Sequence, residues 1–491
     1  MCRTIPMVQA NQPFQPGVDL VIRGATVVST RDGSLQAHQD VAISGDRIVS
    51  VGPASPDGVP RDASVVDADG KYLVPGFNDM HAHMLSRPGG GGDPSETFGL
   101  MLAHGITGFR QMSGSARMLR QRAAGTLMPE RAPRLLAMPG PVLTPFNAAT
   151  AQAAVGTVRQ QHDLGADFIK AALMTSEAFY AAQAEARRLG IPILGHLPNG
   201  IDVARASGEG MRSIEHLGPG ATLLACCSTD SAAVSAKLAA LPGPKLPPLR
   251  FSFLEPVLDR VLAKVVINPV NLSRQGDIDI LAQVTASFDQ GAVAGLAQCF
   301  VADGTWHVPT LIRTRTMNLC DDPEFPAQPG LRYIAPSTLR AWQNAASKFA
   351  SFPASARQTF RAVYATLTHL ASLLDAAGVR MLAGSDSGGA AWEVPGIALH
   401  QEFDELARAG LSPLRILQMT TWDAAEFLDA TDVMGTVDAG KHADLVLLDA
   451  NPVESADHLH RIAGVIRSGR YYGPADLDAI KDNVTASRSA S

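Results

Sequence analysis

The middle of the chain, from residue 73 to about residue 425, repeats one pattern. Short apolar segments of strand length alternate with longer stretches rich in Ala, Leu, Arg and Glu, which favour helices. Eight strand candidates can be counted: LVPGFNDMHAH, GITGFRQM, RLLAMPGPVLT, ADFIKAAL, IPILGHL, SIEHLG, HVPTLIR and MLAGSDSG. Repeated βα units build a parallel sheet. Eight of them predict an α/β fold of the TIM (β/α)8 barrel type, whose active site lies at the C-terminal ends of the strands.

The two ends of the chain share a different pattern. Residues 1–72 and 426–491 contain short β-branched runs separated by Gly and Asp turns, such as VDLVIRGATVVST and IAGVIRSGRYY. Because this pattern is absent between them, we predict that the two ends pair into one β-sandwich domain. The intervening residues 73–425 form the barrel domain, in which residues 219–300 are an inserted region longer than a simple βα connection. The polar ending NVTASRSAS predicts a frayed tail.

The composition excludes several classes of protein. In 491 residues, 46% of them apolar, the 41 basic and 47 acidic residues are intermixed and give a net charge of −6. This predicts a globular enzyme acting on a small molecule, not a nucleic-acid or membrane protein, and we expect a homo-oligomer. The cysteines are five in number, with Cys226 and Cys227 adjacent, which argues against a disulfide framework. With no secretory leader or membrane span visible, we expect a cytoplasmic location, although a leader could have been removed.

Polar side chains gather at the predicted C-terminal ends of the barrel strands. His81 and His83 share one face of the first strand, because successive side chains point to opposite faces. Four further strands end in one such residue each, in the order Lys170, His196, His216 and Asp386. Imidazole and carboxylate groups are ordinary ligands for zinc and similar ions. Six side chains from five strands therefore predict an open site for two metal ions.

In this order of motifs the chain resembles the metal-dependent amidohydrolase superfamily. The segments GADFIK, GHLP, SIEHLG and GTVDAGKHADLVLLDANP resemble more narrowly its imidazolonepropionase-like and Xaa-Pro dipeptidase-like branches. The resemblance implies two divalent ions, zinc above all, with one bound by His81, His83 and Asp386 and the other by His196 and His216. It further implies that Lys170 bridges the ions as a carbamate formed with carbon dioxide, since an ammonium group cannot bind a cation.

This metal centre predicts hydrolysis of an amide bond. A hydroxide between two metals ~3.5 to 4 Å apart is a nucleophile near neutral pH, and Asp386 would carry its proton to the departing amine as general base and then general acid. A dipeptide, an N-acyl amino acid or an aryl amide would suit such a site. One alternative is the same centre acting on a lactone, ester, carbamate, urea or phosphotriester. Another is a non-catalytic interaction protein on this scaffold, which would be expected to lack ligands that this chain retains.

Substrate contacts are predicted from position alone. Arg313 and Arg315 follow the strand HVPTL and could meet a substrate carboxylate, and His400 follows the eighth strand near the mouth of the barrel. Glu215 precedes His216 on a strand, so we expect its side chain to point away from the metals. Specificity should depend on the loops after the strands, above all residues 84–98 and the 219–300 region.

Overall fold

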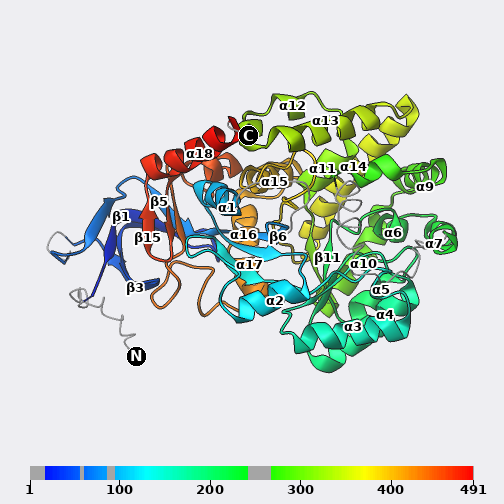
Figure 1. Cartoon of the computed structure of the whole chain (residues 1–491), viewed down its shortest axis with the longest axis horizontal. Coiled ribbons are helices and arrows are strands. Elements are labelled where there is room, and N and C mark those ends of the chain that lie inside the picture. The colour runs from blue at the N-terminus through cyan, green and yellow to red at the C-terminus, as the bar shows by residue number, and fades with distance from the viewer. Residues whose placement is uncertain (1–16, 56–59, 86–93, 242–266, 490–491) are drawn as a thin grey trace, which may run out of the picture.

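The described part of the chain has an α/β architecture (Figure 1). The structure is a computed structural model, and it describes residues 17–55, 60–85, 94–241 and 267–489. The predicted α/β class is confirmed. Parts of the two predicted specificity regions, residues 86–93 and 242–266, lie outside the described residues.

Strands from both ends of the chain form one eight-stranded sheet, at the left of Figure 1. Its order is β15-β14-β13-β5-β1-β2-β3, with β4 beside β1. The predicted pairing of the two ends is observed, since β13 runs antiparallel to β5 with Val446 opposite Val74. All these strands belong to a single hydrogen-bonded sheet, so a sandwich of two sheets is not shown. The strands are β1 Leu20–Val28, β2 Leu35–Ser44, β3 Arg47–Pro53, β4 Ser64–Asp67, β5 Tyr72–Pro75, β13 Leu445–Leu448, β14 Ile462–Arg467 and β15 Arg470–Tyr472.

The alternation of side chains along β13 explains why this strand is apolar throughout. Leu445 and Leu447 pack in a cluster within the mixed sheet, together with Ile22 and Ile43. Val446 points the other way and joins the large core of the α/β part. Both faces of the strand are therefore buried, which ties the mixed sheet to the rest of the molecule.

The middle of the chain forms two parallel sheets, with strand orders β6-β7-β8 and β12-β11-β10-β9. The eighth predicted segment, MLAGSDSG, does not form a regular strand. Its residues join β12 and β6 only through isolated bridges, His307 with Met381 and Ala82 with Ser387, and a bridge from Leu143 to Ala171 joins the two sheets on the other side. Parallel βα units are thus present, but the hydrogen bonding of the described residues does not show a closed barrel sheet. The strands are β6 Phe77–Ala82, β7 Ile106–Gln111, β8 Arg134–Ala137, β9 Ile169–Ala171, β10 Ile193–Gly195, β11 Met211–Glu215 and β12 Trp306–Val308.

The first predicted strand, LVPGFNDMHAH, is two strands in two different sheets. Gly76 separates β5 of the mixed sheet from β6 of the parallel sheet. A Cβ atom at this position would lie 2.0 Å from Oγ1 of Thr107. Only glycine allows the chain to pass this close to β7 as it moves from one sheet to the other.

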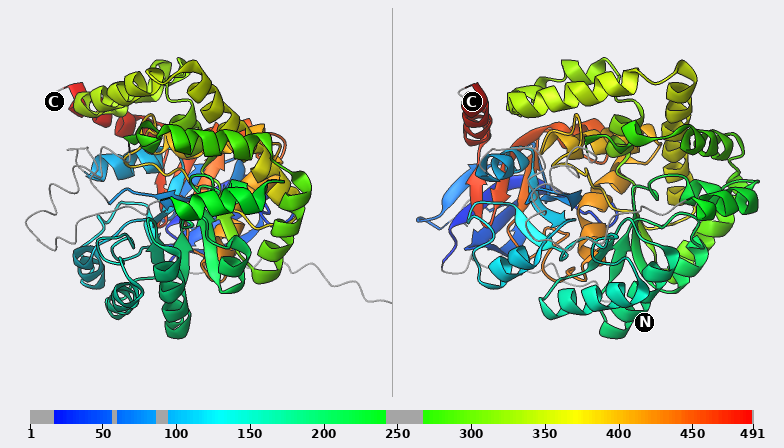
Figure 2. Two further views of the ribbon diagram at one scale, coloured as in Figure 1. Left: turned by 90° about the vertical axis from the view of Figure 1, so that its right-hand side faces the viewer. Right: turned by 45° about the vertical axis from the view of Figure 1, so that its right-hand side comes forward.

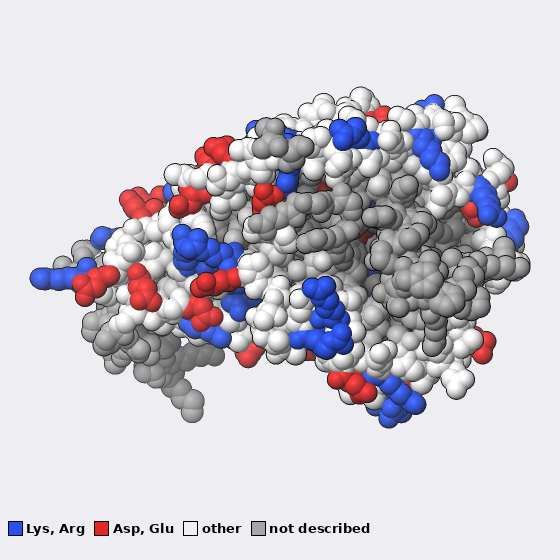
Figure 3. Space-filling model, in the orientation of Figure 1, with Lys and Arg blue, Asp and Glu red and all other residues white. Residues whose placement is uncertain are grey.

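Helices lie around the parallel strands (Figure 2). They are α1 Pro94–Ala103, α2 Ala116–Ala123, α3 Ala151–Asp163, α4 Ser176–Leu189, α5 Val203–Gly208, α6 Thr222–Cys226, α7 Ser231–Ala240, α9 Gln275–Ala286, α10 Gln290–Asp303, α11 Leu311–Asn318, α12 Glu324–Ala327, α13 Pro336–Ala350, α14 Ala354–Ala376, α15 Ile397–Arg408, α16 Pro413–Thr420, α17 Trp422–Phe427 and α18 Pro474–Ser489, with 3-10 turns η2 Pro269–Leu272, η3 Pro329–Tyr333 and η4 Ala456–His460. Among the described residues, no helix combines the length and apolarity that crossing a membrane would need. Basic and acidic side chains are interspersed on the face seen in Figure 3.

The predicted frayed tail is wrong for most of its length, because α18 continues to Ser489. Val484 is 2% exposed and packs in an apolar cluster. Near the end of the helix, the guanidinium of Arg488 lies 2.6 Å from the Glu96 carboxylate and donates from Nε to the carbonyl oxygen of Tyr333 at 3.0 Å. These tertiary contacts, which local composition cannot reveal, hold the small polar residues in a helix.

Candidate metal centre

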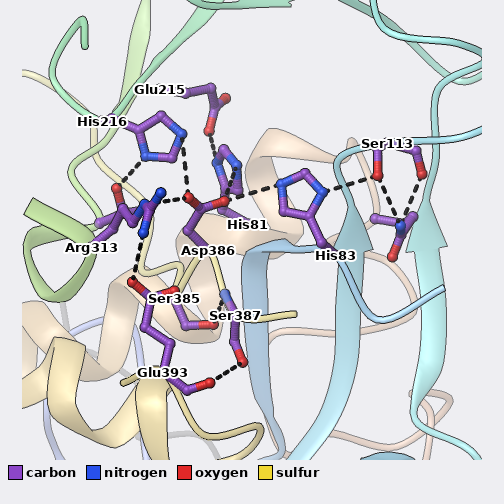
Figure 4. Close-up of polar contacts among 12 residues, drawn as sticks. His81, His83, Ser113, Glu215, His216, Arg313, Ser385, Asp386, Ser387 and Glu393 are labelled. Atoms are coloured by element: carbon purple, nitrogen blue, oxygen red, sulfur yellow. Dashed lines mark hydrogen bonds and ion pairs between the residues drawn. The ribbon is translucent and has the colours of Figure 1, made fainter. Parts of the chain in front are cut away.

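Three histidines and one aspartate meet at the ends of the parallel strands (Figure 4). The Oδ1 atom of Asp386 lies 3.1 Å from Nε2 of His81 and 3.0 Å from Nε2 of His83. Nε2 of His216 lies 3.9 Å from Oδ2 of the same carboxylate. Ligand atoms of His81, His216 and Asp386 all lie within 4.8 Å of one another. These residues could share one ion after small adjustments of their side chains.

His196 and Lys170 come from the next two strands of the same sheet after β11, namely β10 and β9. His196 follows β10, and its ring makes an edge contact with the ring of His216 at a centroid distance of 5.1 Å. Lys170 lies on β9, where its Nζ atom is buried and has no hydrogen-bond partner among the described residues. Burial lowers the pKa of Lys170 from 10.5 to about 8. An amine in this position is unusually ready to lose its proton.

Left-handed backbone occurs at the ends of the strands that carry these groups. The φ angles of His216, Thr310 and Asp386 are 57°, 44° and 56°. Such angles are costly for residues other than glycine and are maintained only where the surrounding structure imposes them. Here the amide of Asp386 donates to the carbonyl oxygen of His81 at 2.7 Å, which holds the carboxylate against the first strand.

Glu215 corrects the sequence-based expectation. The sequence predicts that it points away from the metals, yet its Oε2 atom lies 2.5 Å from Nδ1 of His81, and both side chains are buried. The reason is the left-handed turn at His216, which breaks the alternation of the strand and lets neighbouring residues face the same site. Burial alone would raise the pKa of Glu215, but the charge of Arg110 and the hydrogen bond from His81 outweigh it and hold the pKa well below its usual range.

The Nδ1 atoms of His81, His83 and His216 contact other side chains than Asp386. The hydroxyl of Thr310 donates to the carbonyl oxygen of Pro309 at 2.8 Å, so it accepts from Nδ1 of His216 at 2.6 Å. Nδ1 of His83 lies 2.9 Å from Oγ of Ser113, and Nδ1 of His81 donates to the ionised Glu215. For His81 and His216 this leaves Nε2 with a lone pair. Metal-binding histidines are commonly oriented in this way.

The residues predicted to contact substrate lie in three different places. Nε of Arg313 is 3.2 Å from Oδ2 of Asp386, so Arg313 lies at the centre. Arg315 instead pairs with Glu324 at 2.6 Å. His400 is buried, and its Nε2 lies 2.8 Å from the carbonyl oxygen of His104. The structure brings only Arg313 together with the cluster.

The donor set fits divalent metal ions. Lys170 Nζ is a buried polar atom without a hydrogen-bond partner among the described residues, an arrangement that is costly in a protein interior. Burial also lowers the pKa values of His83, His196 and His216. Neutral imidazoles keep the lone pairs that a metal requires.

Several residues that support the centre were not identified from the sequence. Ser113, Thr310 and Arg110 each contact a group of the centre or its neighbour Glu215. Glu393 was also missed, although its Oε1 atom lies 3.8 Å from Nη1 of Arg313. The one usable signal was position, because Ser113 and Thr310 closely follow the strands β7 and β12.

Comparison with known proteins gives a family match over part of the chain and a fold match over nearly all of it. Residues 287–473 match the model of the Amidohydrolase family. The chain has the fold of a bottromycin amidohydrolase structure, with a TM-score of 0.68 and 24% identity over 96% of this chain and 91% of that one. The family match therefore covers part of the chain, and the solved structure shows the same fold. A Xaa-Pro dipeptidase structure with bound methionine has the same fold, with a TM-score of 0.60 and 17% identity over 92% of this chain and 99% of that one.

Curated relatives match this chain over a short segment. An adenine deaminase from Mesorhizobium japonicum is 43% identical over 68 residues, which are 14% of this chain and 11% of the relative. The match therefore spans about a tenth of the relative's length. The similarity is confined to one segment and does not extend over the rest of the adenine deaminase.

Proposed function

We propose that this chain is a binuclear metal-dependent hydrolase that cleaves an amide C–N bond in a small substrate such as a dipeptide, an N-acyl amino acid or an aryl amide. The supporting observation is the meeting of His81, His83 and His216 at Asp386, close to the ring of His196. In this proposal the parallel strands form a (β/α)8 barrel, and its centre would hold two zinc ions through His81, His83, Lys170, His196, His216 and Asp386, with Lys170 carboxylated. We further propose that the enzyme is a cytoplasmic homo-oligomer.

The mechanism assigns a distinct task to each side chain. Bound divalent ions would lower the pKa of a water molecule and polarise the scissile carbonyl. Asp386 accepts a proton from the attacking water and delivers it to the departing nitrogen. Arg313 holds Oδ2 of Asp386, and Arg313 is the only predicted substrate contact that lies near enough to meet a substrate carboxylate. Glu215 keeps the ring of His81 in one tautomer and orientation.

A substrate screen tests this proposal. Protein reconstituted with zinc should hydrolyse members of a panel of dipeptides, N-acyl amino acids and aryl amides, and the activity should be lost after treatment with a strong chelator. The panel also contains esters, lactones, carbamates, ureas, phosphotriesters and adenine, so that the alternative reactions are tested in the same assay. Full activity in demonstrably metal-free protein, or turnover confined to substrates without a scissile C–N bond, would show the proposal to be wrong.

Replacing Glu215 with Gln should weaken metal binding about 10- to 100-fold, the usual scale for groups that orient metal ligands. The neutral amide orients His81 less firmly and leaves Arg110, which lies 3.1 Å from Glu215, as a buried charge without its counterion. Metal affinity measured by competition with a chromogenic chelator checks the effect. Glu402→Gln, another buried carboxyl that accepts from the amide of Ile312, is the matched control and should keep its metal affinity. Equal affinities in the two variants would exclude the orienting role.

Formation of the Lys170 carbamate should depend on pH. With a pKa of about 8, Lys170 has ~10% neutral amine at pH 7, against ~0.03% for an ordinary lysine. The rate at which metal-free protein regains activity with zinc at fixed dissolved carbon dioxide should therefore rise from pH 6 through pH 8 and level off near pH ~9. The neighbouring imidazoles contribute little to this profile, because burial keeps the pKa values of His196 and His216 well below 6.5. A rate that is flat between pH 6 and pH 8 would contradict this assignment.

A further inference from the structure

Backbone hydrogen bonds join residues 383–387, here called the Asp386 segment, to the strand β6. The amide of Asp386 donates to the carbonyl oxygen of His81 at 2.7 Å. The amide of His83, which directly follows β6, donates to the carbonyl oxygen of Ser387 at 2.8 Å. The position of the Asp386 carboxylate therefore depends on how this segment lies against β6.

A buried carboxylate that the mechanism does not use adds a second connection between the two. Asp79 belongs to β6, is 2% exposed and precedes His81 by two residues. Its Oδ1 atom accepts from the amide of Ser385 at 3.0 Å and from the amide of His81 at 3.2 Å. Its Oδ2 atom accepts from the hydroxyl of Ser385 at 2.6 Å. One side chain is thus bonded both to a candidate metal ligand and to the residue before Asp386.

The directions of these hydrogen bonds require an acceptor at both oxygens of Asp79. The amide of Ser387 can only donate, and it donates to Oγ of Ser385 at 3.1 Å. The single proton of that hydroxyl is directed at Oδ2 of Asp79, while two amides are directed at Oδ1. A carboxylate can accept at both oxygens, but an amide side chain cannot.

The segment needs such a constraint because its backbone turns at Asp386. The φ angle of Asp386 is 56°, a conformation that is costly for residues other than glycine and persists only where the surroundings impose it. Ser385 and Ser387 flank this turn (Figure 4). Asp79 binds Ser385 directly and reaches Ser387 through the hydroxyl of Ser385, so it restrains the chain on both sides of the turn.

We propose that Asp79 is a positioning residue for Asp386. Its carboxylate holds the Asp386 segment in the conformation that places Oδ1 of Asp386 3.1 Å from Nε2 of His81 and 3.0 Å from Nε2 of His83. The consequence for metal binding rests on the proposed function, whereas the restraint of the segment rests on the hydrogen bonds alone. Two separate measurements can therefore test the two links.

The substitution Asp79→Asn tests the inference with the size of the side chain preserved. In either orientation of the new amide, its nitrogen meets a group that already donates. Hydrogen exchange of metal-free protein, followed by mass spectrometry of peptides, should be about 10-fold faster or more in the Asp386 segment, the scale of losing a hydrogen bond to a charged group. After reconstitution with cobalt(II), the affinity for cobalt should fall about 10- to 100-fold, and the visible absorption spectrum should change with the geometry around the ion.

The matched control is Asp40→Asn in the mixed sheet. Asp40 is also 2% exposed, and its two oxygens accept from the amides of Gly24 at 2.9 Å and Ser55 at 3.1 Å. This variant also takes a charge-assisted acceptor from two backbone amides, so its melting temperature should fall as well. Its exchange in the Asp386 segment and its cobalt spectrum should match those of the wild type.

Each outcome decides the inference. It is overturned if exchange in the Asp386 segment or the cobalt spectrum of Asp79→Asn matches the wild type, or if Asp40→Asn changes both as strongly. If the wild type binds no cobalt, the proposed function fails, and exchange in the segment alone then supports or overturns the restraint by Asp79. If Asp79→Asn does not fold, Ser385→Ala replaces it with the same expected results, because it removes the hydroxyl that links Asp79 to Ser387.

Discussion

Replacing Asp386 with Asn is expected to lower the turnover number by ~10² or more, the scale of general acid-base assistance. The amide keeps the shape of the carboxylate and some ability to bind metal, but it cannot accept the proton of the attacking water. Its neighbours, Nε2 of His81 and His83 at 3.1 and 3.0 Å, should remain in place. Metal content should therefore fall much less than turnover. Steady-state kinetics and elemental analysis of the same preparation measure both quantities.

The control for this substitution is Asp423→Asn. Asp423 is 8% exposed and is paired with Arg415, so it shares the burial and the arginine contact of Asp386 but lies outside the centre. It should keep near-normal turnover, even if the protein becomes less stable. If Asp386→Asn also turned over at a near-normal rate, Asp386 would not be the proton carrier.

Replacing Lys170 with Ala is expected to abolish activity and release much of the bound metal. Without the carbamate, two cations would face each other with no anion between them. The truncation also leaves a gap in a buried place, since Lys170 is 3% exposed. Formate, acetate or propionate at millimolar concentration could occupy this gap and supply two oxygens, so activity should partly return when excess zinc is present.

Two comparisons make the Lys170 experiment decisive. An organic amine should give no rescue, because it cannot supply anionic oxygens. Lys441→Ala removes another buried lysine, 6% exposed and outside the parallel sheets, and should leave both metal content and activity intact. If Lys170→Ala retained its metal and carboxylates had no effect, Lys170 would be a substrate contact and not a bridge between metals.

The sequence predicted the individual strands of this fold well. It predicted less completely how these strands are arranged in sheets. Strand periodicity and Gly-rich turns located β7, β10 and β11 within a few residues, because these elements depend on neighbouring residues. The same reasoning merged β5 and β6 into one strand. Their separation depends on Gly76 passing Thr107, a contact between residues far apart in the chain. The eighth segment looks like a strand in its composition, but it forms only isolated bridges.

The sequence by itself determined which groups are available for chemistry and which segments of the α/β part carry them. Residue type and spacing are local properties, so they were sufficient to select His81, His83 and Asp386. Only the tertiary structure decided the directions of the side chains and their partners. Glu215 reaches His81 because the backbone at His216 is left-handed, whereas His400 turns into a separate cavity beside His460. These outcomes depend on packing between distant segments, and packing is not encoded in any short stretch of the chain.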